Sequence, residues 1–454
     1  MAKFNREKAL RKIEFKRKWR NYSRYVYIAV PCVLCCLLCL YFAYSKFFVS
    51  EEQAVIRTTV GDFIYGDIVI SAYIDGEYSN TIPGKDDGYI VEKVSCDNDA
   101  IGKWNSDDWG IMVTDLSKRT KCNVYFKKKP DSKVPEIIAQ LDTSGKCPTV
   151  NDDGSVNVTG VEATNGYLCK AKDAYGDSYY YRGNVTNNYV KFADKYWRIV
   201  RINGDGTVRV IYDGTSAHAN GEASADRQIG TSAFNSSYND NAYVGYMYGK
   251  TGASTYADAH ANTNKSTIKT YIDDWYKTNI VGTTNEQYLA DNIFCNDRSM
   301  AGNNSGTGAG TSVTYYRWYN GPWESENYSK YNKKMMLTCS QKNDAFTVSD
   351  TTNGNGALTY PVGLLSTDEI ALAGGWNAAN SGYYLYSGQV WWASSPYYFG
   401  GLGAFVRGVY SDGHADGFSD GVGSSHGVRP VFNLKAEVLL QGSGTAEDPY
   451  RISS

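Results

Sequence analysis

The stretch YWRIVRINGDGTVRVIYDG, residues 196–214, predicts a β-hairpin. Apolar and polar side chains alternate on both sides of NGDG, a turn sequence that suits two antiparallel strands. Further along the chain, STIKTYIDDWYKTNI (266–280) has the spacing of an amphipathic helix. Its apolar face is expected to carry Ile268, Tyr271, Ile272, Trp275 and Tyr276.

A second, shorter helix is predicted at 366–374. Ser366 and Glu369 have the spacing of a capping box, and Gly374 stands where a helix commonly ends. The rest of residues 177–454 has the pattern of short strands joined by long loops. The sequence therefore predicts an α+β domain over 177–454.

The preceding segments have other patterns. Residues 46–130 predict a small all-β stalk domain, with strands at 67–74, 88–96, 109–115 and 122–128. Residues 131–176 are expected to form a disulfide-bearing connector between this domain and the larger one.

The N-terminus has a strong charge asymmetry. Residues 1–24 hold ten Lys and Arg against two Glu, although the whole chain has a net charge of −2. The next twenty positions carry no charge, enough for a helix to cross a bilayer. We therefore expect a transmembrane helix at 25–45, with 1–24 as a basic cytoplasmic segment and the C-terminal domain extracellular at the cell membrane. A cleaved signal peptide, with Ala43-x-Ser45 as a weak cleavage site, is the alternative.

The cysteines divide at the same boundary. The four in the apolar segment are expected to pack at a helix–helix contact rather than to bind a metal; they are Cys32, Cys35, Cys36 and Cys39. An even number beyond it predicts three disulfides. Neighbour pairing closes the shortest loops and is the expected connectivity: Cys96–Cys122, Cys147–Cys169 and Cys295–Cys339.

Several motifs together resemble a family of gut-bacterial surface proteins. They are YYYRGNVTNNYVKFADKYWRIVRINGDG (179–206), TIKTYIDDWY with the following YLADNIFCNDRS, and WWASSP…GVRPVFNL with the tail GSGTAEDPY. The resemblance implies a C-type-lectin-like domain at the C-terminus, in which irregular loops at one end of a scaffold present the ligand surface. The last part is also similar to retroelement-diversified variable proteins and, more distantly, to formylglycine-generating enzymes.

The run WWASSPYYFGGLGAFVRGVYSDGHADGFSDGVGSSHGVRPVFNL, residues 391–434, contains the candidate binding residues. Scaffold roles are expected for Trp391, Trp392, Ala404, Val406, Val409, Val428, Arg429, Pro430, Val431 and Phe432, with Arg429 tying loop carbonyls or a buried acid. By alternation the other large or polar residues should face away from the scaffold and form the ligand surface. They are Tyr397, Tyr398, Phe399, Phe405, Arg407, Tyr410, His414, Asp416, Phe418, Asp420 and His426.

The sequence offers little for catalysis. The last third of the chain lacks a cysteine pair, and the four histidines, His218, His260, His414 and His426, stand apart from one another. The tripeptides with which calcium-dependent lectins bind sugars are absent. We therefore expect no enzyme activity, no catalytic residue, no metal, no cofactor and no nucleic-acid partner.

Composition favours recognition instead. The chain has 39 Tyr together with abundant Gly, Ser and Asn, a combination typical of antibody-like binding loops. The prediction is a membrane-anchored binding protein that recognises a glycan or protein ligand through stacked rings, with Arg407 and the aspartates setting selectivity. The alternatives are a structural or adhesive surface protein acting by self-association and an enzyme of the formylglycine-generating branch.

Overall fold

The computed structural model describes most of the chain beyond the N-terminal segment. The described residues are 11, 14–19, 62–65, 68–85, 87–106, 108–115, 119–128, 132–158, 160–161, 163–301, 306–319, 334–376, 378–417, 421–439 and 441–452. The chain divides into two compact units, Met1–Pro130 and Asp131–Ser454.

The smaller unit is built from β strands. One sheet has the order β1 (Asp62–Tyr65), β2 (Ile68–Ile74), β7 (Thr120–Lys128) and β4 (Tyr89–Cys96), with β3 (Glu77–Ser79) paired to β2. A separate antiparallel pair joins β5 (Ile101–Asn105) and β6 (Gly110–Thr114). Phe126 is buried, and the rings of Trp104 and Trp109 lie against it. Each of the four ranges predicted to contain a strand does contain one.

The larger unit contains a seven-stranded sheet with the predicted hairpin inside it. The order is β25 (Val431–Leu434), β13 (Val208–Gly214), β12 (Lys195–Ile202), β10 (Gly176–Arg182) and β9 (Tyr167–Asp173), with β11 (Tyr189–Phe192) on β12 and β26 (Tyr450–Arg451) on β11. Because β9 belongs to this sheet, residues expected to form a connector pack within the larger unit. The antiparallel pairing of β12 with β13 confirms the hairpin.

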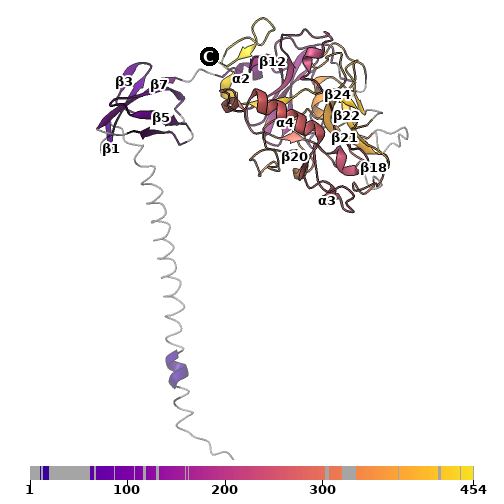
Figure 1. Cartoon of the computed structure of the whole chain (residues 1–454), viewed down its shortest axis with the longest axis horizontal. Coiled ribbons are helices and arrows are strands. Elements are labelled where there is room, and N and C mark those ends of the chain that lie inside the picture. Colours follow the sequence, from indigo (N-terminus) through magenta and orange to yellow (C-terminus); the bar gives the residue numbers. More distant parts are fainter. Residues whose placement is uncertain are drawn as a thin grey trace, which may run out of the picture. The chain divides into compact units, whose positions relative to one another are not determined.

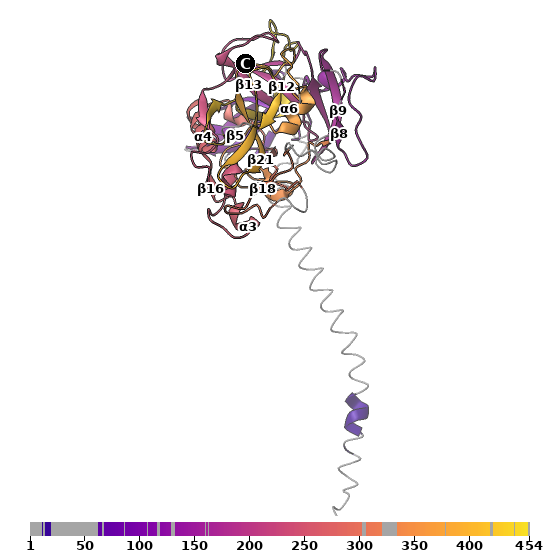
Figure 2. The same ribbon diagram turned by 90° about the vertical axis from the view of Figure 1, so that its right-hand side faces the viewer.

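A second sheet of six strands carries the predicted ligand run. Its order is β14 (Thr231–Ala233), β24 (Ser425–Gly427), β21 (Trp391–Phe399), β22 (Ala404–Val409) and β23 (Ala415–Gly417), and β18 (Thr314–Tyr315) pairs with β21. Three short pairs complete the strands: β15 (Met247–Tyr248) with β16 (Asn264–Lys265), β17 (Phe294–Cys295) with β20 (Ala345–Phe346), and β8 (Val156–Asn157) with β19 (Lys334–Met335). β21, β22 and β18 lie together on one side of the larger unit (Figure 1), and Figure 2 again places β18 beside β21.

Both predicted helices are confirmed. In α4 (Thr267–Asn279) the Ser266 hydroxyl accepts from the amide of Lys269, and one face is buried. In α6 (Thr367–Ala373) Ser366 and Glu369 form the expected capping box, and Gly374 ends the helix at a φ of 120°. The other helical segments among the described residues are short. They are residues 14–19, α2 (Val134–Ile138), α3 (Tyr256–Ala259) and 3₁₀ turns at Ala225–Arg227, Asn241–Val244, Glu286–Tyr288, Lys342–Asp344 and Ala436–Val438.

One apolar core joins the two large sheets. The ring centres of Trp197 on β12 and Phe432 on β25 lie 4.7 Å apart, and Trp391 and Trp392 on β21 belong to the same buried cluster. Arg429 has the predicted scaffold role: it donates to the carbonyls of Tyr212 and Leu385 and to the carboxylate of Asp213. The three disulfides join the predicted partners, Cys96–Cys122, Cys147–Cys169 and Cys295–Cys339.

Two predictions about architecture are corrected. The structure consists mostly of β sheets, so the α+β class is wrong, and long loops rather than helices connect the strands. Among the described residues, no helix combines the length and apolarity needed to cross a bilayer. This finding contradicts the predicted single-pass placement in the cell membrane. Residues 25–45, to which the predicted transmembrane helix was assigned, lie outside the described residues.

Candidate functional site: an aromatic surface and a hydroxyl-lined pocket

Five rings gather on the sheet formed by β18, β21 and β22. Tyr315 lies opposite Tyr398 in the pairing of β18 with β21, and Tyr398 lies opposite Phe405 in the pairing of β21 with β22. Tyr397 precedes Tyr398, and Tyr319 follows β18 after one turn. We call Tyr315, Tyr319, Tyr397, Tyr398 and Phe405 the aromatic surface.

The rings of the aromatic surface contact one another in sequence. Ring centres are separated by 4.3 Å between Tyr315 and Tyr319, 5.4 Å between Tyr319 and Tyr397, and 5.0 Å between Tyr397 and Tyr398. Tyr398 stacks on Phe405 at 4.4 Å with an interplanar angle of 4°. All five rings are half-buried, so each is held by its neighbours and still reaches solvent.

Exposed aliphatic side chains extend the aromatic surface. Leu402, at the turn between β21 and β22, is 86% exposed, and Val313, just before β18, is 46% exposed. A Cβ placed on Gly401 would lie 3.3 Å from the Cγ2 atom of Val313, so the turn and the start of β18 are in contact. Large apolar side chains that are this exposed and contiguous commonly mark an interaction site.

Arg407 supports the surface from beneath. It is 1% exposed, its guanidinium lies 4.4 Å from the centre of the Tyr397 ring, and it donates to the carbonyl of Trp318. Trp318 is itself fixed, since its indole N–H donates to Asp368 and its ring meets that of Trp376 edge-on. Arg407 therefore orders the ring above it and does not face solvent.

Two residues that were predicted to face a ligand are buried instead. Arg407 is buried as described, and Phe399 is 0% exposed within the core. Simple alternation fails because the pairing of β21 with β22 shifts register between Trp392 and Pro396 and again between Pro396 and Tyr398. Such irregularities re-aim side chains, and here Tyr397 and Tyr398 are both half-buried although they are adjacent.

The remaining predicted residues lie elsewhere. His414 stacks on Tyr410 with ring centres 4.9 Å apart and bonds the carboxylate of Asp412 at 2.6 Å. His426 packs on Trp392 with ring centres 4.8 Å apart, so the two histidines have separate environments. The structure places Asp416 on β23 by its backbone only, and Phe418 and Asp420 lie outside the described residues.

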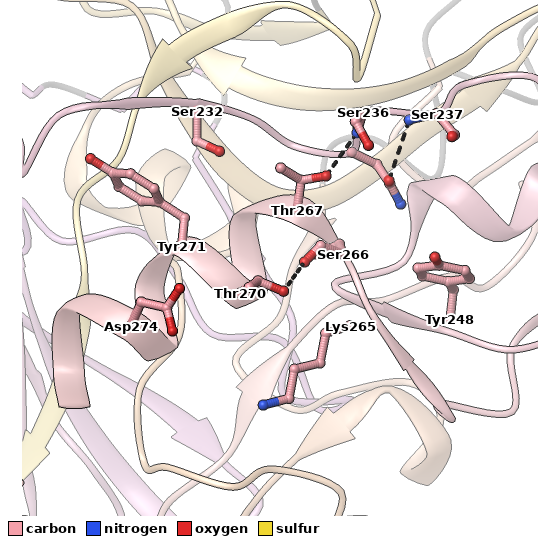
Figure 3. A pocket seen from close by; sticks show the side chains of 11 residues that line it. Ser232, Ser236, Ser237, Tyr248, Lys265, Ser266, Thr267, Thr270, Tyr271 and Asp274 are labelled. Atoms are coloured by element: carbon pink, nitrogen blue, oxygen red, sulfur yellow. Dashed lines mark hydrogen bonds between the residues drawn. The ribbon is translucent and has the colours of Figure 1, made fainter.

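A hydroxyl-lined pocket of about 440 Å³ opens at the N-terminal end of α4 (Figure 3). Figure 3 shows Tyr271 and Tyr248 on opposite sides of the first turn of α4, with Ser266, Thr267 and Thr270 between them. Its lining is Ser232, Asn235, Ser236, Ser237, Tyr248, Lys265, Ser266, Thr267, Thr270, Tyr271 and Asp274. The sequence reasoning missed this pocket, although the Ser-Thr helix start at 266–267 and the serines at 236–237 were visible in it.

Two of the described histidines, His218 and His260, are buried beside charged groups. His218 is buried between two carboxylates, 2.7 Å from Glu222 and 2.9 Å from Asp226. Burial and the charge of Arg298 hold the pKa of His260 well below its usual range. Within the part of the chain that the structure describes, His, Cys, Asp and Glu nowhere form a group of three or more arranged to hold a metal ion.

Comparison with known proteins adds no relative. No protein-family model, curated protein or solved structure matches the chain. A C-type-lectin-like fold is therefore not shown, and the resemblance to gut-bacterial surface proteins stays a prediction from sequence motifs.

Proposed function

We propose that the protein acts by recognition, binding a protein ligand through the aromatic surface. The observation that carries this proposal is the cluster of five half-buried rings continuing into exposed Leu402 and Val313. Tyrosine and other aromatic side chains are enriched where proteins bind one another, because they bury a large area while freezing few torsions.

The ring orientations favour a protein ligand over a glycan. A sugar ring stacks on an open aromatic face, but Tyr398 and Phe405 cover one face of each other at an angle of 4°. Tyr397 stands at 89° to Tyr398, so the rings do not make a flat platform. Side chains of a protein can fill the uneven hollows between such rings, and Leu402 and Val313 add aliphatic contacts that a sugar would not use.

The sequence around the rings contains one charged residue, Arg317 before Tyr319, and its charge is compensated by Asp297 and Asp368. Neither 311–316 nor 397–406 contains a charged residue. The expected ligand therefore presents an apolar patch with hydroxyl or amide groups for the tyrosine hydroxyls. A tyrosine hydroxyl is protonated at neutral pH, and burial raises the pKa of Tyr398 further, so this hydroxyl can donate as well as accept.

The structure beneath the rings lowers the entropic cost of binding. Arg407 holds Tyr397 from below, and β18 pairs with β21 directly under Tyr315 and Tyr398. Side chains ordered before association lose less freedom when the ligand arrives. This preorganisation is expected in a binding surface and is not needed in an ordinary solvated loop.

The test compares the full chain with two triple variants on an array of purified secreted protein domains. Secreted domains are the suitable set because three disulfides are typical of oxidising compartments. One variant changes Tyr397, Tyr398 and Phe405 to Ser. The control variant changes Tyr78, Ile101 and Met112 to Ser, three exposed large side chains of the smaller unit.

We expect binding to particular array members that the aromatic variant loses and the control variant keeps, with both variants folded by circular dichroism. Equal binding by both variants would contradict the proposal. Sedimentation velocity of the chain alone supplies the second criterion. The aromatic variant could lose self-association without losing binding to any array member. That result would show that the surface serves self-association and not ligand recognition.

A further inference from the structure

We propose that the pocket at the N-terminal end of α4 is a second binding site and that it takes a neutral pyranose sugar. Six of its eleven lining residues are Ser or Thr. Its volume of about 440 Å³ lies within the range of small-molecule sites, but most such sites are lined mainly by apolar side chains. A lining this rich in hydroxyls matches a ligand that is itself rich in hydroxyls.

The hydroxyls of the pocket are oriented in advance. Those of Ser266, Thr270 and Ser232 donate to the backbone carbonyls of Tyr246, Ser266 and Ala233, respectively. Each hydroxyl has one donor and two acceptor positions, so donation inward leaves acceptor capacity. Ser266 is fully buried and already accepts from the amide of Lys269, so ligand hydroxyls can donate to Thr270 and Ser232 without rearranging this wall.

Asn235 supplies the complementary donor. Its side chain is 3% exposed, and its Oδ1 atom accepts from the amide of Ser237 at 3.5 Å. That bond fixes which way the amide faces, and the Nδ2 group has no hydrogen-bond partner among the described residues. An unmet buried donor costs about 1–3 kcal/mol. An oxygen atom of a bound ligand would satisfy it.

The charges and helix amides around the pocket disfavour an anionic ligand. Lys265 is paired with Asp273 at 2.8 Å, so its charge is already compensated, and Asp274 contributes a carboxylate to the wall. The second and third amides of α4 are also occupied: Ile268 donates to the carbonyl of Phe234, and Lys269 donates to Ser266. The helix start therefore offers little to an anion.

Two tyrosine rings give the site apolar walls. Tyr248 and Tyr271 line the pocket on opposite sides of the first turn of α4 (Figure 3). The hydroxyl of Tyr271 lies 3.5 Å from the carbonyl of Ile229, and the ring of Tyr248 meets that of Tyr243 edge-on. A pyranose has both hydroxyl edges and apolar C–H faces, which fits walls of this mixed kind.

The experiment titrates the full chain with methyl glycosides of glucose, galactose, mannose and N-acetylglucosamine, followed by ligand-observed NMR. Glucuronate and glucosamine serve as charged comparators. Thr270→Trp fills the pocket from an exposed helix position, and Thr278→Trp is its matched control. Both threonines donate to the carbonyl four residues earlier, but only Thr270 lines the pocket. Asn235→Asp keeps the acceptor for Ser237 and removes the Nδ2 donor.

We expect at least one neutral glycoside to bind the unmodified chain and Thr278→Trp equally, and to bind Thr270→Trp and Asn235→Asp at least tenfold more weakly. Absence of binding by every neutral glycoside, unchanged binding by Thr270→Trp, or preference for glucuronate or glucosamine would overturn the proposal. The variant that changes Tyr397, Tyr398 and Phe405 should bind the sugar normally. The test of the sugar site is therefore independent of the test of the aromatic surface.

Discussion

The guanidinium of Arg407 lies 4.4 Å from the centre of the Tyr397 ring and donates to the carbonyl of Trp318. A buried cation thus connects a ring of the aromatic surface to the core. The planar guanidinium donates to the carbonyl and stacks beneath the ring at the same time. The ammonium group of lysine cannot make both interactions.

Arg407→Lys should lower the free energy of unfolding by about 1–3 kcal/mol, since it loses hydrogen bonds to a buried carbonyl. Urea unfolding followed by tryptophan fluorescence measures this change. Arg451→Lys is the control, because the Arg451 side chain is 42% exposed and its ion pair with Asp448 contributes little. Equal midpoints for the two variants would show that Arg407 does not order the surface.

A single carboxylate compensates several buried guanidiniums. Asp213 accepts from Arg227 and Arg429, each at 2.8 Å, and Arg198 lies 3.8 Å away, all fully buried. Asp213→Asn should destabilise the larger unit by about 3–5 kcal/mol, because it leaves buried cations without a counter-charge. Asp177→Asn, which removes an exposed partner of Lys170, should change the unfolding midpoint little.

Local sequence patterns were sufficient to predict the elements whose turns and ends are set by neighbouring residues. The hairpin at 196–214 and the helix that begins after Ser366 follow from turn and capping residues, and the structure contains both. The disulfides followed from loop length. The overall class did not follow, because many strands have only two or three residues and leave no alternation to recognise.

The candidate site was predictable only in part. Tyr397, Tyr398 and Phe405 were predicted from their size and from alternation within 391–434. Tyr315 and Tyr319 join them through the pairing of β18 with β21, which no local sequence pattern indicates. Register shifts in β21 invalidated the alternation that had placed Phe399 and Arg407 outside. These are tertiary effects, which depend on which strands meet.

The environment of His218 predicts sensitivity to acid. The hydrogen bond from His218 lowers the pKa of Glu222. For Asp226, burial raises the pKa, but bonds from His218 and Thr215 outweigh it and the pKa is lowered. A carboxylate whose folded pKa is depressed stabilises the fold above its unfolded pKa, and that contribution is lost as pH falls.

Stability should therefore decline as pH falls below the ordinary values of 4.5 for Glu222 and 3.8 for Asp226. Urea midpoints measured across this range should fall less steeply in His218→Gln than in the unmodified chain. His414→Gln removes a more exposed pair with Asp412 and should have a smaller effect. Parallel curves for the unmodified chain and His218→Gln would contradict this account.

The division at Pro130 predicts two separable unfolding transitions. Replacing Cys96 and Cys122 with Ser opens a loop with a sequence separation of 26 in the smaller unit. The loss of loop closure should cost that unit about 3 kcal/mol. Scanning calorimetry should show one transition moving to lower temperature and the other unchanged. Replacing Cys147 and Cys169 should move the other transition, and a shift of the same transition in both variants would contradict independent units.

Replacing Leu402 distinguishes an effect on ligand binding from an effect on the stability of the fold. At 86% exposure it contributes little to the fold, so Leu402→Ser should leave the unfolding midpoint almost unchanged. If a protein ligand covers the turn between β21 and β22, the leucine becomes buried, which stabilises the complex by about 1.5–3 kcal/mol. Leu402→Ser should then weaken binding of a partner found on the array by about tenfold or more. Val281→Ser, at another exposed apolar position of the larger unit, should not. If both variants bind with unchanged affinity, the ligand contacts the rings without covering the turn, and the binding surface is limited to the five aromatic residues.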